Sequence, residues 1–458
     1  MYPLEPSTEQ MRSLADAAGD FVIEHISNLA DAPAEDIEGF EKLVEELREA
    51  PPEGGGELKA VLDELARGAA KTLNTAGPGY LAYIPGGGLY TAAIAEFLAQ
   101  GINRYVGLWE FAPGLAQIEV NVIRWLCDLF DFPQEARGIL TTGGSMANFS
   151  AIVSARKALL DDDFLDGTIY VSEQVHASVT KSAMLAGFAS RNIRKVATTA
   201  DLHVDPGGLA AAIRDDRAAG RRPFLLVASA GTTNTGAVDA IGELASLAER
   251  EGIWFHVDGA YGGFFQLTAR GRERFAGIER ADSITLDPHK GMFLPYGTGC
   301  LIVRDGAKLR AAHHASADYL QDLAGEELLP NFTEYSPELS REFRGLRVWL
   351  PLKLHGVSAF REALDEKLDL ARYLYERLRE IPGLELPWEP ELTVVAFRGR
   401  YDAASKGILE RINASKRVFM SSTTLQDRFT IRAAILSHRT HRERVEEAAE
   451  IVEKAAGA

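Results

Sequence analysis

The stretch Ser283-Ile-Thr-Leu-Asp-Pro-His-Lys290-Gly291 begins as a short apolar run and ends in a polar segment that carries one lysine. About thirty residues earlier, the stretch Ile253-Trp-Phe-His-Val-Asp258-Gly-Ala-Tyr261 ends in the same way with one aspartate. Short apolar runs bounded by polar turns are typical of buried strands in a parallel sheet. One βα unit plus the next strand takes about this many residues. We therefore expect Asp258 and Lys290 at the ends of neighbouring strands.

Further apolar runs of this kind alternate with helical patterns across the middle of the chain. They occupy residues 138–144, 168–172, 223–229 and 299–303. Such alternation predicts an α/β fold with a mostly parallel central sheet. Functional groups gather beyond the carboxyl ends of the strands in such a sheet, and Asp258 and Lys290 fall there.

The flanking segments predict two smaller parts. Apolar residues have helical spacing over residues 8–72 without a strand pattern. After residue 346 a helical stretch, two apolar runs and a charged helix follow. We predict an N-terminal helical segment, residues 1–88, a large α/β domain, residues 89–345, and a small C-terminal α+β domain, residues 346–458. Three helices alone make a thin core, so the first ones should cover the rest of the chain or, preferably, a second subunit.

Composition excludes several functional classes. The 458 residues carry a formal net charge of −17, which disfavours binding to a nucleic acid backbone. There are two cysteines and no evident signal peptide, so we expect a cytoplasmic protein. No uncharged apolar run approaches the roughly 18 residues that span a bilayer. The paired histidines His313/His314 and His438/His441 are better explained as surface residues than as metal ligands, and we expect no metal.

The chemistry of a lysine beside a carboxylate suggests a particular cofactor. A lone lysine at a strand end is usually a solvated structural residue. A lysine amine can nevertheless attach covalently to an aldehyde, and a carboxylate can keep a heterocyclic ring nitrogen protonated. Pyridoxal phosphate requires both groups. We therefore expect Lys290 and Asp258 to bind pyridoxal phosphate.

Two further motifs fit this cofactor. The segment Thr141-Thr-Gly-Gly-Ser145-Met-Ala-Asn148 is a strand-to-helix junction made of small residues. Such a junction can direct free N–H groups and a positive helix end at a phosphate, although a plain βα turn would have the same pattern. His176 follows another predicted strand. A lone histidine usually packs in the fold, but beside an aromatic cofactor its ring could stack on one face.

Taken together, these residues resemble the group II pyridoxal-phosphate-dependent decarboxylases, particularly the aromatic-L-amino-acid decarboxylases. The similarity runs in order through nearly the whole chain. Its motifs are Gly-Tyr-Leu-Ala-Tyr83-Ile-Pro85, Thr-Gly-Gly-Ser145-Met-Ala-Asn, Val-His176-Ala-Ser-Val, Ala-Gly-Thr232-Thr-Asn-Thr-Gly, His-Val-Asp258-Gly-Ala-Tyr, Asp-Pro-His289-Lys290 and Arg341-Glu-Phe-Arg-Gly-Leu-Arg347-Val-Trp349.

The resemblance implies a fold of type I among pyridoxal-phosphate enzymes, and a homodimer whose N-terminal helices wrap the partner subunit. It also implies a role for each matching residue. Lys290 would hold the cofactor covalently, Asp258 would pair with its ring nitrogen and His176 would stack on the ring. The remaining cofactor contacts would be Thr232 near the ring and Gly144, Ser145 and His289 at the phosphate. Tyr83 and Trp109 would form apolar walls for the substrate.

The resemblance also bears on the reaction. Tyr319 lies where decarboxylases of this family carry a loop tyrosine, and relatives that release an aldehyde commonly have phenylalanine there. With Tyr319 and His176 both present, we expect decarboxylation of an aromatic L-amino acid (tryptophan, tyrosine, phenylalanine or DOPA) to its amine and CO2. The alternatives are an aldehyde synthase and a decarboxylase of glutamate or another amino acid. Asp287 replaces the asparagine of animal relatives, and an ionised carboxylate there would repel phosphate.

Overall fold

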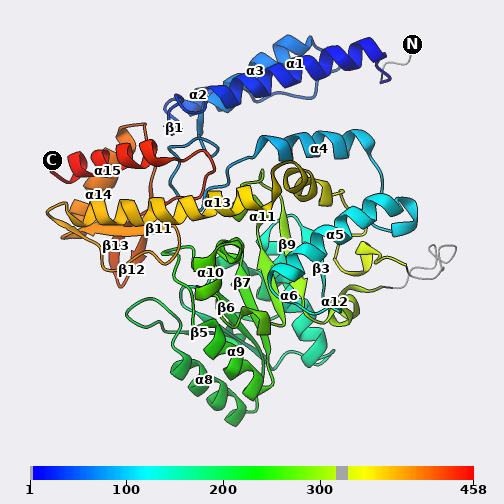
Figure 1. Ribbon diagram of the computed structural model, residues 1–458, viewed down its shortest axis with the longest axis vertical. Coiled ribbons are helices and arrows are strands. Elements are labelled where there is room, and N and C mark those ends of the chain that lie inside the picture. The colour runs from blue at the N-terminus through cyan, green and yellow to red at the C-terminus, as the bar shows by residue number, and fades with distance from the viewer. Residues whose placement is uncertain (1–3, 316–327, 458) are drawn as a thin grey trace.

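The computed structural model describes residues 4–315 and 328–457. A sheet of seven strands forms its centre (Figure 1). The strand order is β3-β9-β8-β7-β6-β4-β5. The strands are β3 (Arg137–Thr141), β4 (Gly167–Ser172), β5 (Ile193–Val196), β6 (Arg222–Ser229), β7 (Trp254–Gly259), β8 (Ser283–Leu286) and β9 (Gly299–Val303). Strands β4 to β8 run parallel, and only β9 is antiparallel to its two neighbours, β3 and β8. The predicted mostly parallel α/β sheet is confirmed.

The apolar runs become strands because helices cover both faces of the sheet. Every residue of β4, β7, β8 and β9 is buried, as expected for a parallel sheet between two helical layers. The helices around this sheet are α4 (Tyr90–Ile102), α5 (Pro113–Leu129), α6 (Gly144–Leu159), α7 (Ala177–Leu185), α8 (Pro206–Ala218), α9 (Ile241–Glu251), α10 (Ala269–Arg274), α11 (Pro288–Gly291) and α12 (Gly306–His313). The carboxyl ends of β6, β7 and β8 bring three predicted residues to one edge of the sheet: Thr232 in the loop after β6, Asp258 near the end of β7 and Lys290 in α11 after β8.

A long helix, α13 (Gly345–Arg379), connects the central sheet to a smaller one (Figure 1). Its helical dihedrals are interrupted at Gly356, whose φ of 74° lies in the left-handed region that glycine tolerates. The second sheet is antiparallel in the order β10-β11-β13-β12. Its elements are β10 (Leu384–Glu385), β11 (Val394–Gly399), β12 (Ser421–Leu425) and β13 (Arg428–Ala434), with helices α14 (Asp402–Ala414) and α15 (Arg442–Gly457). This confirms the predicted small C-terminal α+β unit.

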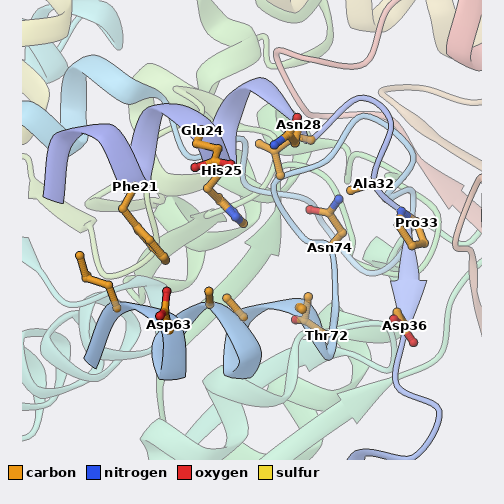
Figure 2. Close-up of a pocket in the computed structure, with 15 residues that line it drawn as sticks. Phe21, Glu24, His25, Asn28, Ala32, Pro33, Asp36, Asp63, Thr72 and Asn74 are labelled. Carbon is orange, nitrogen blue, oxygen red and sulfur yellow. The ribbon is translucent and has the colours of Figure 1, made fainter. Parts of the chain in front are cut away.

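The N-terminal helices extend away from the body of the molecule (Figure 1). They are α1 (Thr8–Ser27), α2 (Phe40–Glu46) and α3 (Leu58–Ala70), and none of them contains a buried residue. A two-residue bridge, β1 (Glu35–Asp36) with β2 (Thr72–Leu73), closes their base. A hollow of about 440 Å³ separates α1 from α3, with Phe21 and His25 facing Asp63 across it (Figure 2). None of the predicted site residues lines this hollow.

Across the described ranges, 4–315 and 328–457, no helix combines the length and the apolarity that crossing a membrane requires.

Candidate active site

Lys290 lies just beyond the carboxyl end of β8, in the short helix α11 that Pro288 begins. Its Nζ is 2.8 Å from Oδ2 of Asp287, whose side chain is only 3% exposed. Nδ1 of His289 donates a hydrogen bond to the main-chain oxygen of Thr298 at 2.7 Å. Burial lowers the pKa of His289, which favours a neutral ring. The Asp287 Oδ1 atom is buried without a hydrogen-bond partner among the described residues.

Asp258 occupies the end of β7, next to Thr285 of β8 in the sheet. The residue is 8% exposed. Asn148 Nδ2 donates to its Oδ2 at 3.1 Å, and the Ala260 N–H donates to its Oδ1 at 3.1 Å. Among the described residues, no lysine, arginine or histidine forms an ion pair with Asp258. A buried carboxylate is stable when a cation pairs with it, so Asp258 fits a protonated ring nitrogen such as that of pyridoxal phosphate.

Two glycines lie beside Asp287 at the start of helix α6: Gly143 just before the helix and Gly144 as its first residue. Gly143, at φ 150°, precedes the helix, and no side chain caps the helix N-terminus. A Cβ atom on Gly144 would lie 2.9 Å from Asp287 Oδ2 and 3.1 Å from the Ala260 Cβ, so a side chain would not fit there. Uncapped N–H groups at the start of a helix of this length bind phosphate well. Ser145, the next residue, is exposed.

His176 precedes α7 and caps it. Its Nδ1 accepts hydrogen bonds from Ser178 N–H at 3.2 Å and from the Ser178 hydroxyl at 2.8 Å. His176 is otherwise exposed, so one end of the ring is fixed while its faces remain accessible. That arrangement is compatible with stacking on an aromatic cofactor.

Thr232 lies in the loop after β6, where it is 2% exposed and its hydroxyl is 3.1 Å from that of Thr235. Arg432, on β13, holds this loop in place. It donates to the main-chain oxygens of Thr233 and Asn234 and, at 2.8 Å, to that of Tyr83. Burial lowers the pKa of Arg432 to about 10. A single guanidinium therefore joins the small sheet, the Thr232 loop and the Tyr83 loop.

The structure brings most, but not all, of the predicted residues together. Lys290, His289 and Gly144 surround Asp287, and a chain of hydrogen bonds links Asp258 with His176. Tyr83 has an exposed side chain and a positive φ of 52°. Its loop meets the Lys290 segment at Gly86, where an added Cβ would be 2.5 Å from the His289 oxygen.

One of the predicted residues within the described ranges is not joined to this group. Trp109 lies in the 3-10 turn Trp109–Phe111, and its N–H donates to Asn331 at 3.1 Å. It shares no hydrogen bond with the other candidates in the part of the chain that the structure describes. Tyr319 lies outside the described residues.

Sequence reasoning missed three polar residues that connect the predicted ones. Asn148 and Ser178 stand inside quoted motifs, and His256 lies two positions before Asp258, yet none was given a role. His256 is 1% exposed, and burial lowers its pKa to about 4. A histidine in an otherwise apolar strand was a usable signal, because a buried imidazole normally requires hydrogen-bond partners.

The chain is similar to known proteins over nearly its whole length. Residues 41–400 match the family model described as the pyridoxal-dependent decarboxylase conserved domain. The chain is 36% identical over 451 residues to an aromatic-L-amino-acid decarboxylase of Bacillus atrophaeus, covering 95% of this chain and 93% of that one. It is 26% identical to a phenylacetaldehyde synthase of Arabidopsis thaliana, covering 98% and 96% of the two chains. The crystal structure of Oryza sativa TDC with PLP and tryptamine superposes with a TM-score of 0.94 at 26% identity, over 100% of this chain and 99% of that one.

Proposed function

Because the chain belongs to the pyridoxal-dependent decarboxylase family, we propose that this enzyme converts an aromatic L-amino acid to its amine and CO2. The observation that carries the chemistry is the pair of ionisable groups at neighbouring strand ends, Asp258 at the end of β7 and Lys290 just after β8. The choice of an aromatic substrate is supported by the 36% identical relative and by the tryptamine in the Oryza sativa structure. We expect tryptophan, tyrosine, phenylalanine or DOPA to be the substrate.

In the proposed reaction, the side chains of the protein hold and orient the cofactor and the substrate. When bound, pyridoxal phosphate supplies an electron-withdrawing ring that accepts the electron pair of the bond broken to the carboxyl group. Lys290 attaches the cofactor through Nζ, and Asp258 keeps the ring nitrogen protonated, which strengthens that withdrawal. Gly144, Ser145 and His289 bind the phosphate, and Thr232 lies beside the ring. The accessible face of His176 covers the ring and limits the entry of water.

Protonation of the substrate α-carbon determines whether an amine or an aldehyde is released. We propose that the hydroxyl of Tyr319 gives the proton to the substrate α-carbon after CO2 departs, with His176 as a second candidate. This role rests on the resemblance of the sequence around Tyr319. Without that proton, reaction with O2 would release an aldehyde, ammonia and peroxide instead. Tyr83 and Trp109 are proposed as apolar walls for the aromatic side chain.

We also propose that the enzyme is a homodimer that works in the cytoplasm. The N-terminal helices expose apolar side chains on faces that the rest of the chain leaves open. These side chains are Met11, Leu14 and Ile23 on α1 and Val61 and Leu65 on α3. A second subunit would cover these faces. Two free, buried cysteines support a reducing compartment.

A product assay tests the proposed reaction. Purified enzyme with added pyridoxal phosphate is offered tryptophan, tyrosine, phenylalanine, DOPA and glutamate, and amine, aldehyde and peroxide are quantified. Amine from at least one aromatic substrate is expected. Aldehyde with peroxide would instead assign the enzyme to the oxidative branch, as in the Arabidopsis relative's name. Activity on glutamate alone would refute the aromatic substrate.

Variants test the residue roles separately. Lys290→Ala should lose nearly all turnover, whereas the exposed Lys406→Ala should keep it. Borohydride reduction followed by peptide mass spectrometry should locate the cofactor on the Lys290 peptide in the unmodified enzyme and nowhere in Lys290→Ala. Tyr319→Phe should shift the product from amine toward aldehyde. Unchanged amine formation in that variant would exclude Tyr319 as the proton donor.

A further inference from the structure

A continuous chain of buried hydrogen bonds links four structural elements beneath the site. It begins at Trp254 on β7, whose Nε1 donates to the Ser283 hydroxyl at 2.8 Å. The same hydroxyl is 2.8 Å from His256 Nδ1. Nε2 of His256 is 3.0 Å from Asn148 Oδ1. All of these residues except Trp254 are at most 1% exposed, and Trp254 is 2% exposed.

At Asn148 the chain branches. Its Nδ2 donates both to Asp258 Oδ2, at 3.1 Å, and to the Ser178 hydroxyl, at 2.9 Å. The Ser178 hydroxyl in turn is 2.8 Å from His176 Nδ1. One side-chain amide on α6 therefore contacts Asp258 directly and reaches His176 through Ser178.

The two ends of the chain fix the direction of every bond in it. An ionised carboxylate can only accept, so the Asn148 amide group must present Nδ2 to Asp258 and Oδ1 to His256. His256 Nε2 must then carry the ring proton. Burial lowers the pKa of His256 to about 4, so the ring is neutral and its Nδ1 is an acceptor. The Ser283 hydroxyl donates to that Nδ1 and accepts from the Trp254 indole, which can only donate. The assignments made from both ends agree.

The second branch fixes His176 in the same way. The Ser178 oxygen accepts from Asn148, so its own proton is free to point at His176 Nδ1. The Ser178 main-chain N–H points at the same atom. Two donors converge on Nδ1, which is therefore an acceptor, so the His176 ring carries its proton on Nε2. The Nε2–H is the donor that His176 presents to the site.

We propose that Asn148 and His256 are positioning residues that orient Asp258 and set the tautomer of His176 through this chain. Asn148 directs the Asp258 carboxylate toward the ring nitrogen by donating a hydrogen bond to its Oδ2. The second N–H of the same amide donates to the Ser178 hydroxyl and so selects the tautomer of His176 that carries its proton on Nε2. His256 holds the Asn148 amide in the only orientation that does both. This inference rests on the proposed cofactor site but not on the identity of the amino-acid substrate.

Cofactor binding measured without substrate tests the proposal. Apoenzyme variants are titrated with pyridoxal phosphate, and the absorbance of the bound cofactor is recorded against pH. Asn148→Leu should raise the Kd for pyridoxal phosphate about ten- to a hundredfold, because a hydrogen bond to a charged group is lost. It should also shift the pH titration of the cofactor absorbance. In the amine assay, kcat should fall more than KM changes.

Matched variants separate positioning from simple disruption. Ser150→Ala alters another buried polar residue on α6 that lies outside the chain, and it should leave Kd and the absorbance titration unchanged. Asn148→Asp keeps the side-chain volume but places a second acceptor against Asp258, so it should make cofactor binding strongly pH-dependent. Because Asn148 and His256 act in one chain, Asn148→Leu combined with His256→Gln should cost less than the two single effects added.

The outcomes are distinguishable from a failure of the proposed reaction. If Asn148→Leu binds pyridoxal phosphate within twofold of the unmodified enzyme, with the same absorbance titration, the positioning role is wrong. Should Asn148→Leu not fold, Asn148→Asp decides, and pH-independent binding by that variant overturns the proposal. Additive effects of the Asn148 and His256 variants would also overturn it. An unexpected product in the amine assay changes the reaction class but leaves these binding results in force.

Discussion

The buried ion pair between Glu119 and Arg341 provides a quantitative test of how the cofactor-binding end of the sheet is supported. Nη2 of Arg341 lies 2.6 Å from Glu119 Oε1, and both side chains are fully buried. The same Nη2 donates to the main-chain oxygen of Leu140 in β3 at 3.1 Å, and the Gly345 N–H donates to Glu119 Oε2 at 3.1 Å. The pair therefore joins α5, the start of α13 and strand β3, which ends at Thr141.

The expected cost of breaking this pair follows from its burial. Arg341→Met leaves the Glu119 carboxylate in the interior without its cation, and such a change costs about 3–5 kcal/mol of unfolding free energy. With a urea m-value of about 3 kcal/mol/M, the midpoint should fall by about 1–1.7 M. Replacing both partners, in Arg341→Met/Glu119→Leu, removes the unpaired charge as well. The double variant should therefore regain most of the lost stability.

The assay is urea unfolding followed by tryptophan fluorescence, with all variants at one protein and one pyridoxal phosphate concentration, because both concentrations shift the apparent stability. The control is Glu446→Gln, which breaks an exposed pair with Arg442 at 2.7 Å and should change stability by less than about 0.5 kcal/mol. The reasoning is refuted if Arg341→Met costs no more than the control. A double variant that is less stable than Arg341→Met would refute it equally.

Three further predictions follow from other buried groups. Asp287→Asn removes the carboxylate that pairs with Lys290 at 2.8 Å. Because a negative charge beside the predicted phosphate loop is lost, the Kd for pyridoxal phosphate should fall about tenfold in an apoenzyme titration. A higher Kd would contradict this. Burial lowers the pKa of His438 to about 3, so the histidine of the unfolded chain binds a proton first and the free energy of unfolding falls as pH drops from about 6.5 toward 3. His438→Gln should remove about 2–3 kcal/mol of the free energy that the unmodified enzyme loses between pH 7.5 and pH 4.5. The exposed His441→Gln should leave that loss unchanged. Both cysteines are buried, so the folded enzyme should show no thiol that reacts with Ellman's reagent until urea is added.

Most of the central sheet could be predicted from sequence because its strands are buried on both faces. An uninterrupted apolar run such as that of β9 can be recognised as a strand from its own residues alone. β5 was missed because Arg194 and Lys195 interrupt its four residues, two of which are only half-buried and one exposed. β12, with sequence Ser-Ser-Thr-Thr-Leu, was missed for the same reason at the edge of the small sheet. The antiparallel direction of β9 leaves no trace in its composition, because an apolar run is the same in either direction.

Only the part of the candidate site that lies at strand ends could be predicted from the sequence. The positions of Asp258 and Lys290 at neighbouring strand ends could be predicted because the carboxyl ends of parallel strands meet at one edge of a sheet. The bond from Asn148 to His256 joins residues 108 positions apart, and no local pattern announces it. Packing of α6 against the sheet creates that contact, so only the three-dimensional structure could identify Asn148 as a junction.

We expect Asp258 and Asp287 to determine the orientation in which the cofactor binds, because the two carboxylates have different partners. Asp258 has hydrogen-bond donors but no cationic partner among the described residues, so it attracts a ring cation and repels a phosphate. Asp287 is offset by Lys290, and the uncapped start of α6 lies beside it. An anion is therefore tolerated at the Asp287 end and excluded at the Asp258 end. The two carboxylates carry the same charge, and the difference in their partners is what gives the site its polarity.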